Sequence, residues 1–301
     1  MITVVCLSPS LDETIVLPSL VLGGTNRVLE KRVCAGGKGV NVALTLARMG
    51  ENVRLAVFRH EQGARPLFDA LAASQVFCLP VDVPGTLRTN IKLFDASSDT
   101  VTEVNAPAEP VPPAAVMQME DAVAAACAES RWLVLTGSLP KGYPADAYAR
   151  MIRRVREAAP GCRVALDAEG EPLRLGVMEK PDLMKPNRCE LELLVDRKLD
   201  TEEAVIDAAQ DLAHSGVRTV IVSMDVDGSA LVTEERTICA KAIPVPVATT
   251  VGAGDALLSG YIKASGQGEE KAFACGIAAA TARVAGRDGD AESYLPLVQM
   301  K

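Results

Sequence analysis

Short apolar runs alternate with amphipathic stretches along most of the chain. Runs such as 2–7 and 132–136 are rich in aliphatic residues and pass into Ser-Pro or Gly-Ser turns, which is typical of buried strands. The stretch 114–128 has the pattern of a helix. Further strands are predicted at 52–58, 76–81, 162–166, 219–223, 229–233 and 237–243, and further helices at 64–74, 144–158, 201–214 and 270–285. This alternation predicts one α/β domain over residues 1–301, with a doubly wound, mostly parallel sheet.

Four extended segments lack the apolar density of core strands. These segments are 14–18, 27–33, 86–96 and 100–105. We therefore expect a small exposed sheet, built from residues near 12–34 and 86–105. Arg88, Asn90 and Lys92 alternate along it and so project from one face. Exposed edges and one apolar face favour a homodimer formed through this sheet.

The composition and net charge of the chain limit the kinds of protein that it can be. The chain has 301 residues, of which 49% are hydrophobic, so it can bury a substantial core. A net charge of −8 disfavours a large basic surface for nucleic acid or anionic lipid. Eight scattered cysteines without a C-x-x-C pair, and only two histidines, disfavour a zinc site and a disulfide framework. No long apolar run or signal-peptide pattern occurs, so we expect a soluble, cytoplasmic protein.

The stretch 249–260 joins a glycine loop to the start of an apolar helix. The backbone amides of Gly252, Ala253 and Gly254 are expected to point into one concavity, where the helix dipole favours an anion such as a phosphate. Asp255 lies in the first helical turn. Its carboxylate can either cap the helix or face the same concavity as a general base.

A second glycine loop, at 35–41, also opens a helix. Lys38 at such a helix start predicts another anion pocket. This is not a Walker A loop, because Gly39 stands where a serine or threonine would be needed for the metal.

Polar residues also follow the ends of other predicted strands. Asp12 comes soon after the strand 2–7, where it can bind a ligand or cap a turn. Asn187 is a good helix cap, and Glu190 three residues later fits a capping box.

Three motifs, taken together, resemble those of the PfkB (ribokinase-like) family of sugar and nucleoside kinases. They are VGAGDALLSG at 251–260, AGGKGVN at 35–41 and KPNRCE at 185–190, and the resemblance spans essentially the whole chain. It implies a ribokinase-like fold in which the small sheet is a lid over the sugar. It also implies that Asp255 takes the proton of the accepting hydroxyl while the amides of 252–254 hold the transferred phosphoryl group.

The resemblance also assigns substrate and nucleotide residues. The residues implied to bind the sugar or its phosphate are Asp12, Arg27, Gly37, Lys38, Asn41, Arg88, Asn90, Lys92 and Ser138. Those implied to face the nucleotide are Lys185, Asn187, Ser223, Asp225, Gly228 and Gly254. Glu190 would control Mg²⁺ through water, and ATP would be the phosphate donor.

Three positions depart from the family pattern. Asp225 replaces a glycine near the expected polyphosphate, Glu169 replaces a small hydroxyl residue, and Arg59-His60 replaces a glycine pair. His60 could act as a catalytic acid, but we expect it to lie in a surface loop.

The expected activity is ATP-dependent phosphorylation of a phosphorylated ketohexose. Lysine in the loop 35–41 is typical of family members whose acceptor already carries a phosphate, and fructose 1-phosphate is the first expectation. Tagatose 6-phosphate and fructose 6-phosphate are alternatives, and so is a sugar-phosphate sensor without turnover. A dinucleotide-dependent oxidoreductase is disfavoured, because no G-x-G-x-x-G follows the first strand.

Overall fold

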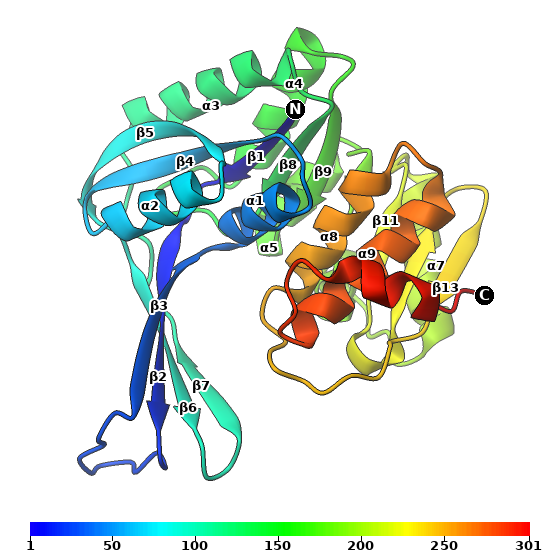
Figure 1. Ribbon diagram of the computed structural model, residues 1–301. Helices are drawn as coiled ribbons and strands as arrows, with labels where there is room; N and C mark the ends of the chain where they lie inside the picture. Colours follow the sequence, from blue (N-terminus) through cyan, green and yellow to red (C-terminus); the bar gives the residue numbers. More distant parts are fainter.

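The computed structural model describes residues 1–301 and contains two sheets (Figure 1). The large sheet has nine strands in the order β13-β12-β11-β10-β9-β8-β1-β4-β5. Its strands are β1 (Ile2–Cys6), β4 (Val53–Gln62), β5 (Phe77–Thr86), β8 (Trp132–Thr136), β9 (Arg163–Asp167), β10 (Leu183–Met184), β11 (Val220–Ser223), β12 (Ser229–Val232) and β13 (Thr237–Ala240). Neighbours from β11 to β5 are parallel, and β12 and β13 are added antiparallel. The predicted mostly parallel sheet is confirmed.

Helices cover both faces of the large sheet (Figure 1). The helices are α1 (Lys38–Arg48), α2 (Arg65–Ala73), α3 (Pro113–Cys127), α4 (Ala147–Ala158), α5 (Gly170–Val177), α6 (Arg188–Val195), α7 (Glu202–His214), α8 (Ala253–Ala264) and α9 (Glu269–Val284), with short 3₁₀ turns η1 (Asp225–Asp227) and η2 (Ala291–Leu297). None of them combines the length and apolar composition that a bilayer-spanning segment requires.

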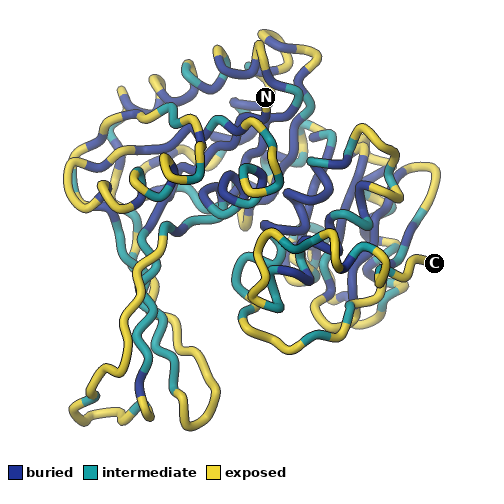
Figure 2. Tube along the Cα trace, viewed as in Figure 1, coloured by how far each residue is buried: buried dark blue, intermediate teal, exposed yellow.

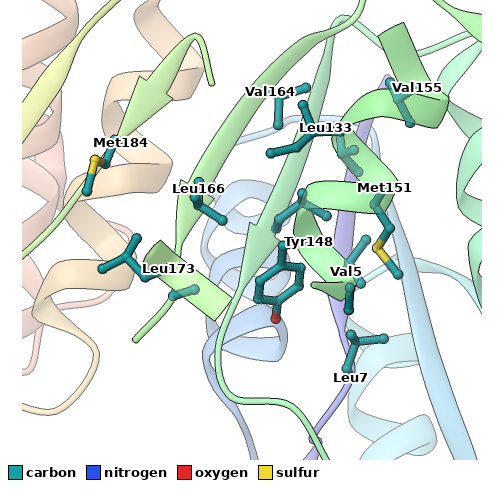
Figure 3. Packing of buried hydrophobic residues seen from close by; sticks show 14 of the residues in the cluster. Val5, Leu7, Leu133, Tyr148, Met151, Val155, Val164, Leu166, Leu173 and Met184 are labelled. Atoms are coloured by element: carbon teal, nitrogen blue, oxygen red, sulfur yellow. The ribbon is translucent and has the colours of Figure 1, made fainter. Parts of the chain in front are cut away.

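The side chains of β1 alternate between the two faces of the large sheet, and both faces are covered by helices. Val5, and Leu7 just after the strand, belong to a core with α3, α4 and α7, whereas Val4 and Cys6 belong to a second core with α1, α2, α8 and α9. This is the period of two that a strand imposes. Figure 3 shows the first core, where the ring of Tyr148 from α4 lies against the strands.

The small sheet stands away from this body (Figures 1 and 2). Its strands run in the order β3-β2-β6-β7, and are β2 (Ser10–Leu17), β3 (Glu30–Gly36), β6 (Thr89–Asp95) and β7 (Thr100–Val104). Strand β7 is exposed throughout, and β3 is exposed over most of its length. The two predicted sequence regions therefore do form one exposed sheet.

Several predicted boundaries were wrong. β2 begins at Ser10 rather than at residue 14, so Asp12 lies within a strand and not in a turn after β1. β4 and β5 run longer than predicted because they pair with each other as far as Gln62 and Thr86. His60 is therefore a buried strand residue, 7% exposed, rather than part of a surface loop.

Helices α8 and α9 approach so closely that a side chain does not fit between them at Gly260. A Cβ atom there would lie 2.4 Å from the carbonyl oxygen of Cys275 in α9. Backbone atoms within helices cannot yield as a flexible side chain can.

We expect Gly260→Ala to separate these two helices and lower the free energy of unfolding by about 1–3 kcal/mol. Denaturant unfolding followed by circular dichroism would measure this loss. Gly266→Ala is the control, because a Cβ at Gly266 meets no atom within 4 Å. Equal stability of the two variants would contradict the close packing.

Candidate active site

The glycine loop before α8 leaves two backbone amides without partners. Gly252 caps the helix in the left-handed region, with φ of 82°, and no side chain bonds the helix start. The amide of Ala253 donates to the carbonyl oxygen of Thr250 at 3.3 Å, whereas the amides of Gly252 and Gly254 donate to no group of the chain. Arg283 of α9 holds the loop by donating from Nε to the carbonyl oxygen of Val251 at 2.9 Å. Two free amides at a helix N-terminus form a place for an anion.

Asp255 lies in the first turn of α8 and is only 5% exposed. Its Oδ2 atom accepts a hydrogen bond from Nδ2 of Asn41 at 2.9 Å, and its side chain caps no amide of the helix. Of the two alternatives for this carboxylate, capping is therefore disfavoured. Burial, and next the nearby charge of Asp167, raise the pKa of Asp255 to about 6, against the opposing effects of Asn41, Lys185 and Lys38.

A buried carboxylate that the sequence analysis did not single out, Asp167, lies at the end of β9. Its Oδ1 atom is 3.3 Å from Nζ of Lys185 and 3.7 Å from Nζ of Lys38. Its Oδ2 atom accepts a hydrogen bond from the hydroxyl of Thr136 at 3.2 Å. Burial alone would raise the pKa of Asp167, but the two ammonium groups outweigh burial and lower it. The available signal was an aspartate ending an apolar strand, at the sheet edge where α/β proteins bind ligands.

Lys38, the first residue of α1, lies among several carboxylates. Besides Asp167, its ammonium group faces Oε1 of Glu190 at 3.7 Å. Burial lowers the pKa of Lys38, but the surrounding carboxylates of Asp167, Glu190, Asp255 and Glu169 raise it above its ordinary value. Lys38 is therefore a cation held by charge rather than by short hydrogen bonds.

Asn187 and Glu190 form the expected capping box at the start of α6. The side chain of Asn187 accepts from the amide of Glu190 at 2.8 Å, and Oε2 of Glu190 accepts from the amide of Asn187 at 2.9 Å. Only Oε1 of Glu190 remains to face the site. No group of three histidine, cysteine, aspartate or glutamate side chains is arranged to hold a metal directly.

A second polar cluster surrounds Asp12 on the small sheet. Its carboxylate accepts hydrogen bonds from Ser10 at 3.1 Å and from Asn90 at 3.1 Å, and it pairs with Nζ of Lys92 at 2.9 Å. A Cβ at Gly36 would lie 2.3 Å from Oδ1 of Asp12, so this cluster is beside the loop that leads to Lys38.

The guanidinium group of Arg88 is hydrogen-bonded to backbone carbonyl groups. It donates to the carbonyl oxygens of Ser8 and Pro9, at 2.9 and 3.2 Å, and to that of Ala106 at 3.1 Å. It therefore joins three chain segments where the small sheet meets the body.

Arg27 is not brought to either cluster. It is exposed in the loop 18–29, beyond the pair of Val16 with Glu30. That pair is four residues along the strand from Asp12, or roughly 13 Å at the usual rise per residue.

The remaining predicted residues lie at ends of neighbouring strands. Ser138 is half-buried after β8, and Ser223 at the end of β11 pairs with Asn187. Asp225 is exposed in η1 with φ of 49°, a left-handed conformation that explains why glycine is usual there. Gly228 has φ of 102° and approaches the carbonyl oxygen of Ala240. Gly37 also has a positive φ, of 105°, and passes close to Pro9.

The raised pKa of Asp255 can be tested by measuring stability, without any measurement of turnover. Because the pKa of its carboxyl is about 6 in the folded chain and about 3.9 when unfolded, the charged form is less favourable in the fold. The folded protein therefore loses stability as the pH rises from the unfolded pKa through about 6. Below the unfolded pKa this loss is absent.

We expect Asp255→Asn to be more stable than the wild type at pH 8, by about 1–3 kcal/mol, with the difference vanishing near pH 4. The amide oxygen of asparagine can still accept from Asn41, so the local geometry is kept. Thermal unfolding at several pH values would measure the difference. A variant less stable than the wild type at pH 8 would contradict the raised pKa.

Comparison with known proteins gives a consistent result. The sequence pattern of the family described as "pfkB family carbohydrate kinase" matches residues 7–296. A protein named 1-phosphofructokinase from Rhodobacter capsulatus is 38% identical over 98% of this chain and 92% of its own length. The 1-phosphofructokinase of Escherichia coli (strain K12) is 31% identical over 87% of this chain and 83% of its own length.

Solved structures share the whole fold. The phosphofructokinase-2 of Escherichia coli in complex with fructose-6-phosphate is 27% identical, with a TM-score of 0.89 over 98% of each chain. The tetrameric inhibited form of the same protein is 28% identical, with a TM-score of 0.88 over 98% of this chain and 99% of that one.

Proposed function

Because this chain belongs to the pfkB family of carbohydrate kinases, we propose that it transfers the terminal phosphoryl group of ATP to fructose 1-phosphate and so forms fructose 1,6-bisphosphate. Membership of the family makes it a sugar kinase that phosphorylates a hydroxyl group. The observation that carries the mechanism is the buried carboxylate of Asp255 beside two backbone amides that bond no group of the chain. A sensor without turnover would not need this arrangement.

Asp255 would act as the general base. With a pKa of about 6 it is ionised at neutral pH and still basic enough to take the proton of the acceptor hydroxyl. Its hydrogen bond from Asn41 would fix the direction of the carboxylate. A positioned acid-base group contributes roughly 10²–10⁴-fold to a rate.

The glycine loop and Lys185 would hold the transferring phosphoryl group. The amides of Gly252 and Gly254 are available for its oxygens, and a Cβ at Gly254 would lie 3.0 Å from Nζ of Lys185. Donors already in place stabilise charge in the transition state without reorganising. The amide of Ala253 can contribute only by giving up its weak bond to Thr250.

Residues of α1, of the small sheet and of the segment before β6 would bind the acceptor. Asp12 and Asn41 would bond its hydroxyl groups, while Lys38, Lys92 and Arg88 would supply positive charge for its phosphate. Arg27 would reach this position only if the small sheet moved or a second copy supplied the residue. Ser138 is half-buried just after β8, and its hydroxyl would contact the sugar.

The charges suit a magnesium complex of ATP. Asp167, Asp255 and Glu190 outnumber Lys38 and Lys185, so uncomplexed polyphosphate would meet a net negative site. Oε1 of Glu190 is the carboxylate oxygen that its capping box leaves free, and it would hold Mg²⁺ through water together with the phosphates. When bound, Mg²⁺ neutralises charge on the polyphosphate. Lys185, Asn187, Ser223, Asp225 and Gly228 would lie along the nucleotide.

The acceptor is the part of this proposal with a rival. The relatives named 1-phosphofructokinase favour fructose 1-phosphate, whereas a solved structural neighbour holds fructose-6-phosphate. Tagatose 6-phosphate remains a third candidate of the same class.

The small sheet would serve as a lid and as a dimer surface. Its register places Asp12, Asn90 and Lys92 on one face, and Ile15, Ile91, Leu93, Val33 and Val104 on the other. The polar face would cover the sugar and exclude water. Helix α2 contacts β2 and β3 only near the body, where Leu11 and Ala35 pack against the second core. Val33 and Val104 of the same face are exposed, so we propose that a second copy packs against this outer part.

We expect magnesium- and ATP-dependent ADP release with fructose 1-phosphate to exceed that with fructose 6-phosphate, tagatose 6-phosphate and free fructose. Asp255→Asn should lower turnover by about 10² or more while both substrates still bind. A coupled ADP assay and calorimetric binding would measure the two effects. Preference for an unphosphorylated sugar, or wild-type turnover by the variant, would refute the proposal.

The dimer proposal can be tested with two valines of β7 that are equally exposed, Val104 at 54% and Val101 at 55%. Val104 pairs with Ile91 on the apolar face, and Val101 pairs with Phe94 on the opposite face. We expect Val104→Glu to dissociate the dimer, because it buries a charge, whereas Val101→Glu should leave it intact. Sedimentation velocity would measure both. A monomeric wild type, or equal effects of the two changes, would contradict the interface.

A further inference from the structure

We propose that Asp167 is a positioning residue for phosphoryl transfer, which holds the ammonium groups of Lys38 and Lys185 in the site and sets the charge around Asp255. This inference rests on the kinase reaction proposed above, in which Asp167 has no part so far. The carboxylate of Asp167 would have two connected roles. It would position the two lysines, and its charge would keep Asp255 basic.

The first task follows from burial. Asp167 is 1% exposed and Lys185 is 5% exposed, so each charge depends on the other for compensation. Thr136 donates to Oδ2 of Asp167 and leaves Oδ1, which has no hydrogen bond, directed at the two ammonium groups. Without this carboxylate, Lys185 would be a buried cation with no other ion-pair partner.

Asp167 also joins two parts of the chain. Lys38 comes from the start of α1, and Lys185 follows β10, so their shared carboxylate brings the acceptor loop and the nucleotide strands to one point. Both contacts of Lys38 are 3.7 Å long, which is beyond hydrogen-bond distance. Lys38 can therefore turn towards a bound anion without breaking a hydrogen bond.

The second task concerns the charges that face Asp255. Nζ of Lys185 lies beside the residue before Asp255, because a Cβ at Gly254 would be 3.0 Å from it, and Asp167 and Lys38 adjoin Lys185 through the shared Oδ1 atom of Asp167. Asn41 is a neutral partner of Asp255, and Arg283 is bonded to the adjacent backbone. After burial, the charge of Asp167 is the largest cause that raises the pKa of Asp255, and both lysines oppose it. Neutralising Asp167 would leave two unopposed cations beside the base and make it less basic.

The test compares the acid limb of the pH profile of kcat/KM in three proteins. In Asp167→Asn, we expect the limb to move to lower pH by about one unit, and kcat at pH 7.5 to fall about tenfold or more. In Lys38→Gln, Asp167 keeps Lys185 as its partner, so loss of one cation should move the limb to higher pH. These opposite shifts distinguish a charge effect from a merely structural one.

Asp182→Asn is the matched control. Asp182 also contacts β9, accepting from the amide of Val164 at 2.8 Å, but it does so at the opposite end of that strand. We expect this variant to keep the wild-type acid limb whatever its stability. An unchanged limb in Asp167→Asn, or shifts of the same sign in Asp167→Asn and Lys38→Gln, would overturn the proposal.

NMR titration of isotope-labelled aspartate carboxyl carbons separates this inference from the kinase assignment. The signal lost in Asp255→Asn identifies Asp255, and its titration should move to lower pH in Asp167→Asn. This shift is expected even if no phosphosugar is turned over, in which case only the proposed reaction fails. An unmoved titration would refute the role of Asp167. If Asp167→Asn does not fold, the double variant Asp167→Asn/Lys185→Gln leaves no unpaired buried cation, and the titration of Asp255 should lie at lower pH in it than in Lys185→Gln alone; equal titrations would refute the role of Asp167.

Discussion

The burial of the Asp255 carboxylate is the interaction on which the arrangement of the site depends. A charged group that is 5% exposed is costly unless its surroundings compensate for it. The compensation comes from Asn41, which is 214 residues away in the sequence, and from the lysines beside Asp167. Helices α1 and α8 must therefore lie side by side, and the hydroxyl of Ser259 reaches a carbonyl oxygen of α1 at 3.5 Å. The packing of α1 against α8 and the compensation of the buried Asp255 carboxylate therefore depend on the same contacts.

Much of the fold could be predicted because its signals are local. Buried parallel strands appear as short apolar runs, and the loop before α8 is marked by its glycines. The extension of β4 and β5 could not be predicted, because the residues near His60 are polar and owe their conformation to pairing between strands. The start of β2 at Ser10 has the same cause, since Ser10 pairs with Gly36 on a distant segment.

The site was predicted in part for the same reason. Asp255, Asn187 and Glu190 lie in motifs whose local geometry can be derived from helix capping and glycine conformation. Asp167 was missed because its importance comes from Lys38, 129 residues earlier, and no local pattern records that contact. Arg88 was predicted within the strand 86–96, but it lies just before β6, and its hydrogen bonds to three backbone carbonyls depend on how the two sheets meet.

The small sheet has a consequence for how such a protein can diversify. Both large cores lie within the nine-stranded body, and the strands of the small sheet add few buried residues to them. Substitutions on the apolar face of the small sheet therefore change the folding energy of the body little. Its polar face, which carries Asp12, lies beside the loop that leads to Lys38. Substitutions confined to this sheet could therefore change the proposed association of copies, or the acceptor bound under the proposed lid, without altering Asp255 and its glycine loop.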